Sequence, residues 1–388
     1  MKISVDFGWC SVNHYGEEVC GDRVDFRGSK DRFLGVLADG MGSGVKANIL
    51  STMGSTILRT MLLGGESVDS AVDTVIRSLP VCSERGLNYC TFSVVDIDED
   101  GIASIVEFDN PQAWILRNGQ ILRQEREYHE VEGKAIWERE LPLVEGDIIV
   151  ITSDGCVNAG AGNNFSYTWT WESVAQWLED CAPSVRNARR LADDLVQAVV
   201  NIYDGKPDDD VTAMVIRVPE ELNVSIMYGP PEYPDDDEFM VREFMDSDGM
   251  KIVCGGTTSN VVSRVLDEPV VTMAETAADG IPPISFMDRI ELVTEGVLTM
   301  TRTAEIIEEY YNNTKFNAER MDAENGAAIL AKILIEQCTS LQFFVGKAAN
   351  DAYQEKENRL NLERKLGVVD RICDQLKEHG KKVSIFYY

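Results

Sequence analysis

Four short acidic motifs stand where a strand pattern ends or a turn begins. They are Gly21-Asp22, Ala38-Asp39-Gly40, Ser153-Asp154-Gly155 and Asp208-Asp209-Asp210-Val211-Thr212. The short aspartate side chain fixes a carboxylate close to the backbone, and a glycine directly after it lets a carbonyl or a bound water approach without a Cβ in the way. Converging carboxylates form an all-oxygen shell, which selects Mg²⁺ or Mn²⁺ over zinc. The motifs predict a site for two divalent cations, provided that the fold brings them together.

The elements around these motifs are those that such a site needs. A buried strand over Phe33–Ala38 runs straight into the second motif, and apolar residues at helical spacing predict a helix from about Val45 to Leu63 and a second over Val68–Leu79. Turn signals at Asp100-Gly101 and Asn118-Gly119 indicate an antiparallel meander. Its expected strands are Tyr89–Asp96, Ile102–Phe108, Gln112–Arg117, Gln120–Arg123 and Asp147–Thr152. Helices over Trp171–Leu178 and Ser184–Tyr203 and a strand over Val211–Val218 should complete the first domain.

A single Asp-Gly pair is usually a turn, but the ordered set is more specific. The segments LADGMGSG (37–44), ITSDG (151–155) and DDDVT (208–212) occur in that order, separated by two helices and a set of strands. This pattern resembles the metal-dependent protein phosphatases of the 2C type, in particular the bacterial branch typified by stage II sporulation protein E. The resemblance covers about residues 5 to 218 and includes GEEVCGD (16–22), CTFSVVDID (90–98) and EFDNPQAWILRNG (107–119). It implies an α+β fold, an αββα sandwich with a metal site at one edge.

The resemblance also assigns roles to residues. It implies that Asp39 bridges both metals, that the Gly40 carbonyl and the carboxylates of Asp154 and Asp209 complete the shells, and that Asp22 holds metal-bound water or the second ion. A metal-activated water would then hydrolyse phosphoserine or phosphothreonine, with Asp22, Asp39 and Asp154 as the catalytic set and two Mn²⁺ or Mg²⁺ ions as cofactors. For Asp210 two readings stay open, a residue that supports the ligands or a solvated turn acid.

Two features depart from the eukaryotic pattern. Met41 follows the Asp-Gly where many eukaryotic relatives have a histidine that could protonate the leaving group. His14 precedes Asp22 by a few residues, but a surface-loop histidine is the preferred interpretation. Arg23 and Arg27 are only weak candidates for binding phosphate.

Composition narrows the class of partner. Lys plus Arg is 36 and Asp plus Glu is 66, for a formal charge of −30, which repels nucleic acid and anionic membranes. The 9 cysteines include no CxxC pair, and neither a signal peptide nor an apolar run of roughly 20 residues is present, so a cytoplasmic protein is expected. The expected partner is a phosphorylated regulatory protein, such as the anti-sigma-factor antagonists of relatives.

The second half predicts a separate α/β domain with a regulatory or ligand-binding role. We expect a catalytic domain over 1–219, a proline-rich acidic linker or loop over 220–238 and the α/β domain over 239–388. Its expected elements are strands Lys251–Cys254, Val270–Met273 and Val383–Tyr387 and helices Val261–Leu266, Arg302–Tyr311, Ala327–Leu341 and Leu360–Glu378.

Two features of the second half could take part in binding. Gly255, Gly256, Thr257 and Thr258 lie between a strand and a helix, where backbone N–H groups can bind an anion; a tight turn capped by Thr or Ser is the alternative. The charged stretch Glu355–Lys365 is expected to be a solvated helix face, with a homodimer contact as the alternative. For the whole chain, the alternative to an enzyme is a pseudo-phosphatase that binds phosphoproteins without turnover.

Overall fold

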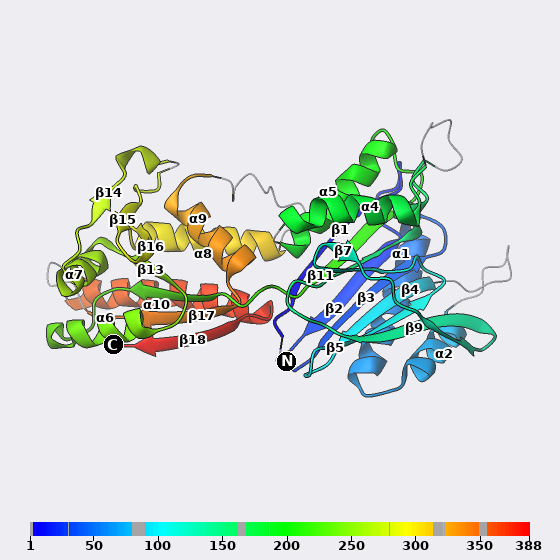
Figure 1. The fold of residues 1–388 in the computed structure, drawn as a ribbon, viewed down its shortest axis with the longest axis horizontal. Coiled ribbons are helices and arrows are strands. Elements are labelled where there is room, and N and C mark those ends of the chain that lie inside the picture. The colour runs from blue at the N-terminus through cyan, green and yellow to red at the C-terminus, as the bar shows by residue number, and fades with distance from the viewer. Residues whose placement is uncertain are drawn as a thin grey trace. The chain divides into compact units, whose positions relative to one another are not determined.

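The computed structural model divides the chain into two compact units, Met1–Pro219 and Glu220–Tyr388 (Figure 1). The structure describes residues 3–29, 31–79, 90–160, 168–185, 187–278, 280–312, 321, 323–348 and 355–388. Across these residues, no helix combines the length and the apolar run that crossing a bilayer requires.

The N-terminal unit contains two antiparallel sheets. The first has the order β2 (Asp22–Gly28), β3 (Phe33–Gly40), β4 (Cys90–Ile97), β5 (Ile102–Phe108), β9 (Lys134–Pro142) and β8 (Glu127–Val131). The second has the order β1 (Asp6–Val12), β11 (Val211–Arg217), β10 (Ile148–Thr152), β6 (Trp114–Arg117) and β7 (Gln120–Ile121).

The two sheets pack face to face and are covered by helices on their outer faces. Leu37 and Ile105 of the first sheet share one core with Ile149 and Met214 of the second. Helices α1 (Gly44–Leu63) and α2 (Val68–Ser78) pack on the outer face of the first sheet. Helices α4 (Trp171–Cys181) and α5 (Ala188–Ile202) pack on that of the second (Figure 1). The result is the expected αββα sandwich within an α+β fold.

The strand connections differ from the expected meander. β5 and β6 follow each other in sequence but belong to different sheets, because the chain crosses the sandwich between Phe108 and Trp114. The Asn118-Gly119 hairpin is confirmed, and both residues have positive φ, 53° and 74°, as a two-residue hairpin turn requires. The helix expected from Ser184 begins instead at Ala188, where the Asn187 side chain accepts a bond of 3.0 Å from the Arg190 N–H.

The C-terminal unit is a seven-stranded sheet, mostly parallel, with helices on both faces. Its order is β14 (Val271–Thr272), β15 (Ser285–Met287), β16 (Ile290–Thr294), β13 (Met250–Cys254), β12 (Asn223–Tyr228), β17 (Ser340–Val345) and β18 (Lys382–Tyr387). Helices α6 (Asp237–Asp246) and α7 (Gly256–Leu266) pack on one face. Helices α8 (Val297–Asn312), α9 (Gly326–Lys332) and α10 (Glu355–Glu378) pack on the other.

Two expectations for this half are wrong. The segment 220–238 is not a linker, since it contains β12, which pairs with β13 on one side and β17 on the other. The prolines and acids that suggested a linker follow this strand. The helix expected over Ala327–Leu341 ends earlier: α9 continues into a π-helical turn, Ile333–Gln337, and Ser340 begins β17.

Candidate metal centre

Two of the candidate aspartates lie on adjacent strands at the same end of the first sheet. Asp22 begins β2 and pairs directly with Asp39, the next-to-last residue of β3. Directly paired residues project to the same face of a sheet. Val24 and Leu37 lie two residues along from Asp22 and Asp39, on that same face, and belong to the core between the two sheets. Both aspartates therefore face the second sheet. The pairing thus brings two carboxylates together at one end of the sandwich.

The second sheet supplies the other aspartates. Asp154 follows β10 and begins the short helix α3 (Asp154–Val157), while Asp209 and Asp210 directly precede β11. Since β10 and β11 are antiparallel neighbours, these two strand ends meet. Ser153 fixes the junction: its N–H donates to the Thr212 carbonyl (3.0 Å) and its Oγ accepts from the Thr212 N–H (3.0 Å).

Glycines allow the acidic segments to approach one another. A Cβ on Gly40 would lie 1.9 Å from the Ala47 carbonyl oxygen of α1, and one on Gly155 would lie 2.2 Å from the Asp210 carbonyl oxygen. A Cβ on Gly21 would lie 2.7 Å from Asp210 Oδ2. These glycines are required because a neighbouring backbone or carboxylate fills the space of a side chain.

Mutual repulsion shows that the four segments share one electrostatic environment. Burial, and then the charges of Asp22, Asp154, Asp209 and Asp210, raise the pKa of Asp39 to about 9. Burial raises the pKa of Asp22 to about 7, although the Thr212 and Ser153 hydroxyls partly offset it. Burial and Asp154 raise the pKa of Asp209 to about 6, and burial also raises the pKa of Asp154. The raised pKa values mean that these carboxylates are not all ionised at neutral pH without a counter-charge. A multivalent cation nearby would stabilise their ionised forms.

The donor set fits a hard divalent cation in chemistry, although the described side chains do not form a closed ligand shell. Both carboxylate oxygens of Asp22 are buried and accept no hydrogen bond of normal geometry. Such an orphaned carboxylate is costly unless a cation or a donor satisfies it. Among the described residues, no three acidic, histidine or cysteine side chains stand close enough to constitute a ready-made metal site.

The remaining candidate residues near the aspartates differ in burial and direction. His14 lies in a loop, as expected, but it is half-buried: its N–H donates to Asp210 Oδ1 (3.0 Å), and its ring Nδ1 is buried without a hydrogen-bond partner in the described structure. Asp210 is 3% exposed, which excludes a solvated turn acid and favours a supporting residue. Arg23 and Arg27 are exposed and, by strand alternation, point to the face opposite Asp22.

Sequence reasoning missed Asn110, which connects the two sheets beside the aspartates. Its Nδ2 donates to Ser93 Oγ of β4 (2.8 Å) and to the Thr152 carbonyl of β10 (3.2 Å). The preceding residue, Asp109, lies near enough to Asp154 to contribute to its raised pKa, after burial. An Asn-Pro pair directly after a strand was the available signal, since it marks a turn rather than a continued hairpin.

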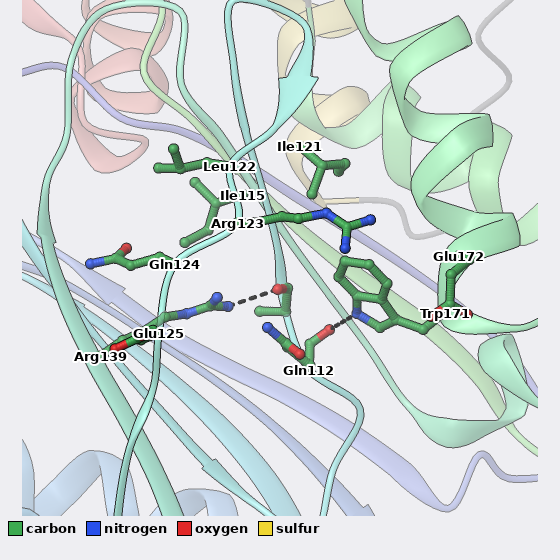
Figure 2. Close-up of a pocket in the computed structure, with 11 residues that line it drawn as sticks. Gln112, Ile115, Ile121, Leu122, Arg123, Gln124, Glu125, Arg139, Trp171 and Glu172 are labelled. Atoms are coloured by element: carbon green, nitrogen blue, oxygen red, sulfur yellow. Dashed lines mark hydrogen bonds between the residues drawn. The ribbon is translucent and has the colours of Figure 1, made fainter.

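A pocket of about 610 Å³ in the same unit is a separate feature (Figure 2). It lies beside the β6–β7 hairpin, and its wall includes Arg139, whose Nη2 donates to the Ala113 carbonyl (2.7 Å), and Trp171, whose Nε1 donates to the Gln112 carbonyl (2.8 Å). None of the candidate aspartates lines it, so it is not the metal centre.

Gly255, Gly256, Thr257 and Thr258, the residues expected to bind an anion, lie in the C-terminal unit, at the start of α7.

Two sequence comparisons relate part of the chain to stage II sporulation protein E. Residues 29–219 match the family model of stage II sporulation protein E. Stage II sporulation protein E of Bacillus subtilis is 23% identical over 198 residues, which is 48% of this chain and 22% of the relative, so the chain spans about a fifth of that protein's length.

Solved structures with similar folds match more than half of the chain. The PP2C phosphatase domain with a fragment of the regulatory domain of SpoIIE from Bacillus subtilis is 21% identical, with a TM-score of 0.46, and the match covers 55% of this chain and 63% of that one. The RsbU and RsbW domains of Rv1364c from Mycobacterium tuberculosis are 21% identical, with a TM-score of 0.46, covering 63% of this chain and 68% of that one.

Proposed function

Because residues 29–219 carry the sequence pattern of the stage II sporulation protein E family, we propose that the chain is a metal-dependent serine/threonine protein phosphatase. The observation that carries this proposal is the convergence of four aspartates, Asp22, Asp39, Asp154 and Asp209, from distant parts of the chain at one end of the sandwich. A structural protein gains nothing from placing repelling carboxylates together, whereas a metal-dependent hydrolase requires it.

The proposed ligands are Asp22, Asp39, Asp154 and Asp209 with the Gly40 carbonyl, which together would hold two Mg²⁺ or Mn²⁺ ions. Bound there, the ions would lower the pKa of a water and neutralise phosphoryl oxygens. The pKa of Asp39 responds, after burial, to the charges of Asp22, Asp154 and Asp209. Asp39 is therefore the residue proposed to bridge the ions.

The residues around the ligands fix their positions. Asp209 Oδ1 accepts the Asp210 N–H (2.8 Å), while Asp210 Oδ1 accepts the His14 N–H (3.0 Å). Asp210 thus ties the 208–210 turn to the segment before Asp22 and leaves Asp209 as the proposed ligand. The Tyr203 hydroxyl donates to the Gly155 carbonyl (3.0 Å), which holds the turn that carries Asp154.

The proposed substrate is a phosphoserine or phosphothreonine on a regulatory protein, of the anti-sigma-factor antagonist type. With a formal charge of −30, the protein surface does not attract a phosphorylated partner. The attraction for the phosphate group would have to come from cations bound at the aspartate cluster. The arginines of β2 point away from the aspartates and would not supply it.

Hydrolysis of p-nitrophenyl phosphate and of a phosphothreonine peptide, each with and without Mn²⁺, tests the proposal. We expect Mn²⁺-dependent turnover that Asp39→Asn and Asp209→Asn each reduce by at least about a hundredfold. Asp204→Asn is the matched control, because Asp204 is exposed and has a φ of 52°, which asparagine tolerates. If the wild-type protein binds phosphopeptide but does not hydrolyse it under any of these conditions, the pseudo-phosphatase alternative replaces the enzyme.

A further inference from the structure

The parallel sheet of the C-terminal unit has a point where the direction of strand addition reverses. From β12 the chain adds β13 and then β16 on one side, and then returns to add β17 and β18 on the other (Figure 1). In open α/β sheets, ligands bind at the carboxyl ends of the strands beside such a reversal, because the connections leave in opposite directions and open a crevice. Here that place lies between the ends of β12 and β17.

Glycines allow the turns at these strand ends to approach closely. A Cβ on Gly229, directly after β12, would lie 1.7 Å from the Lys365 Nζ of α10, and a Cβ on Gly346, directly after β17, would lie 1.9 Å from the Pro230 carbonyl oxygen. Gly255, after β13, has a φ of 115°, and a Cβ on Gly296, after β16, would lie 3.4 Å from its Cα. The turns after four neighbouring strands therefore meet closely.

Buried polar atoms without partners lie between these turns. Tyr228, the last residue of β12, is 3% exposed, yet its hydroxyl has no hydrogen-bond partner within the described structure. Thr299 Oγ1, in the first turn of α8, and one carboxylate oxygen of Glu295 are also buried without a hydrogen-bond partner in the described structure. Burial raises the pKa of Tyr228, and so does the charge of Glu295, so the two groups lie near each other without being bonded. A hydroxyl-bearing molecule between them would satisfy both.

A positive charge lies beside the same strand ends. The Lys365 Nζ donates to the Gly346 carbonyl and lies 5.2 Å from the centre of the Tyr228 ring. Burial lowers the pKa of Lys365 to about 8, and no carboxylate in the described part of the chain contributes to the shift. A partly buried ammonium that no carboxylate among the described side chains pairs with favours an anionic ligand.

The amino end of α7 adds backbone donors. Gly256 and Thr257 are exposed there, and a Cβ on Gly256 would meet nothing within 4 Å. Thr258 cannot serve as the sequence suggested, because its Oγ1 donates to the Cys254 carbonyl (3.0 Å) and accepts from the Gly229 N–H (2.9 Å). Thr258 instead joins the β12 and β13 turns, which leaves Gly256 and Thr257 to face an anion.

We propose that this crevice binds a small phosphorylated molecule with free hydroxyl groups, of the sugar-phosphate or nucleotide class. The phosphate lies at the start of α7 near Lys365, and a hydroxyl lies between Glu295 and Tyr228. The inference goes beyond the proposed phosphatase activity and does not depend on it, since all the residues belong to the C-terminal unit.

Isothermal titration of the full-length chain tests the proposal, with inorganic phosphate, ribose 5-phosphate, AMP and NAD⁺ as probes and ribose and adenosine as unphosphorylated comparators. We expect one phosphorylated, hydroxyl-bearing probe to bind once per chain, at least about tenfold more tightly than inorganic phosphate, and its unphosphorylated counterpart not to bind. Absence of binding by all four phosphorylated probes overturns the proposal, as does binding of inorganic phosphate alone, which would be an adventitious ion only.

Two variants place the ligand. Tyr228→Phe removes only the orphaned hydroxyl, so it should weaken binding about tenfold while leaving the melting temperature without ligand unchanged or raised. Gly256→Asp places a carboxylate at the proposed phosphate position, so it should abolish binding, while an aspartate in the first turn of a helix does not destabilise the helix. Gly367→Asp in α10 is the matched control, because a Cβ on Gly367, as on Gly256, would meet nothing within 4 Å. Unchanged affinity in both Tyr228→Phe and Gly256→Asp contradicts the assignment.

Discussion

Asp22 and Asp39 lie directly opposite each other on β2 and β3, with side chains on the same face of the sheet. Two like charges at this position destabilise the pair of strands unless they are protonated or a cation lies between them. The register of one strand pair therefore links the stability of the protein to its proposed chemistry.

The metal-free protein should lose stability as pH rises. The folded-state pKa of Asp39, about 9, is above its ordinary value of 3.8, so its contribution is fully present below about pH 4 and is lost as pH approaches 9. Asp22, with a pKa of about 7, acts in the same direction. Thermal unfolding in EDTA between pH 5 and 9 should show a falling melting temperature that Asp39→Asn flattens. A wild-type melting temperature that is constant or rises over this range would argue against the repulsion.

The Asp39→Asn variant should therefore be more stable than wild type without metal, but inactive. At pH 8 in EDTA we expect a gain of about 1–3 kcal/mol, well below the full electrostatic figure because solvent reaches part of the side chain. The gain should be smaller at pH 5 and should disappear only below about pH 4, where Asp39 is protonated in both the folded and the unfolded wild-type protein. Denaturant titration at both pH values measures it, with Asp204→Asn as the variant that should show no difference.

Added metal should reverse the order of stability. Ions that bind only the folded state stabilise it by about 2.7 kcal/mol at a concentration a hundred times the Kd. At pH 8, Mn²⁺ should raise the melting temperature of the wild-type N-terminal unit by several degrees but leave Asp39→Asn unchanged. An equal rise in both proteins would mean that the ions bind elsewhere.

Gly40→Ala should prevent α1 from packing against the end of β3. The added methyl group would lie 1.9 Å from a backbone oxygen, which cannot move without displacing α1. We expect a loss of about 2–4 kcal/mol in the unfolding free energy of the N-terminal unit, together with loss of metal binding. Gly28→Ala, also on the first sheet, would make only an ordinary contact at 3.9 Å and should change stability by less than about 1 kcal/mol.

Asn110→Ala should loosen the connection between the sheets next to the aspartates. It removes the donor to Ser93 Oγ and to the Thr152 carbonyl, at an expected cost of about 1–3 kcal/mol. Combining it with Ser93→Ala should cost less than the sum of the two single changes, because both remove the same bond. Strict additivity in urea unfolding would show that the bond does not contribute.

The sequence alone predicted the N-terminal unit better than the C-terminal one for a physical reason. The N-terminal unit contains a local pattern, in which the apolar strand Phe33–Ala38 is followed by Asp39-Gly40 and then by a helical periodicity. Each of these elements can be predicted without knowing which other elements pack against it. The position of Asp22 opposite Asp39 depends on strand register, and the connection from β5 to β6 depends on which sheet the chain joins. Neither is encoded in local periodicity, so the meander was wrong.

The same limitation explains the errors in the second half. β12 is a short apolar strand between two others, and its paired residues lie 26 positions away in β13 and 117 away in β17. Because that pairing is not visible in the local sequence, the prolines after the strand suggested a linker. Thr258 resembles an anion ligand in sequence, but its hydroxyl is engaged by Cys254 and Gly229 only once β12 and β13 are adjacent. His14 and Asn110 likewise gain their places through residues distant in the chain.

The number of Mn²⁺ ions bound per chain at pH 7.5, measured by isothermal titration on protein freed of metal, tests the central claim most directly. We predict two ions per wild-type chain and loss of both in Asp39→Asn, with Asp204→Asn binding as wild type does. Failure of the wild-type chain to bind Mn²⁺ or Mg²⁺, or an unchanged number of ions in Asp39→Asn, would contradict the assignment of these aspartates as a metal centre.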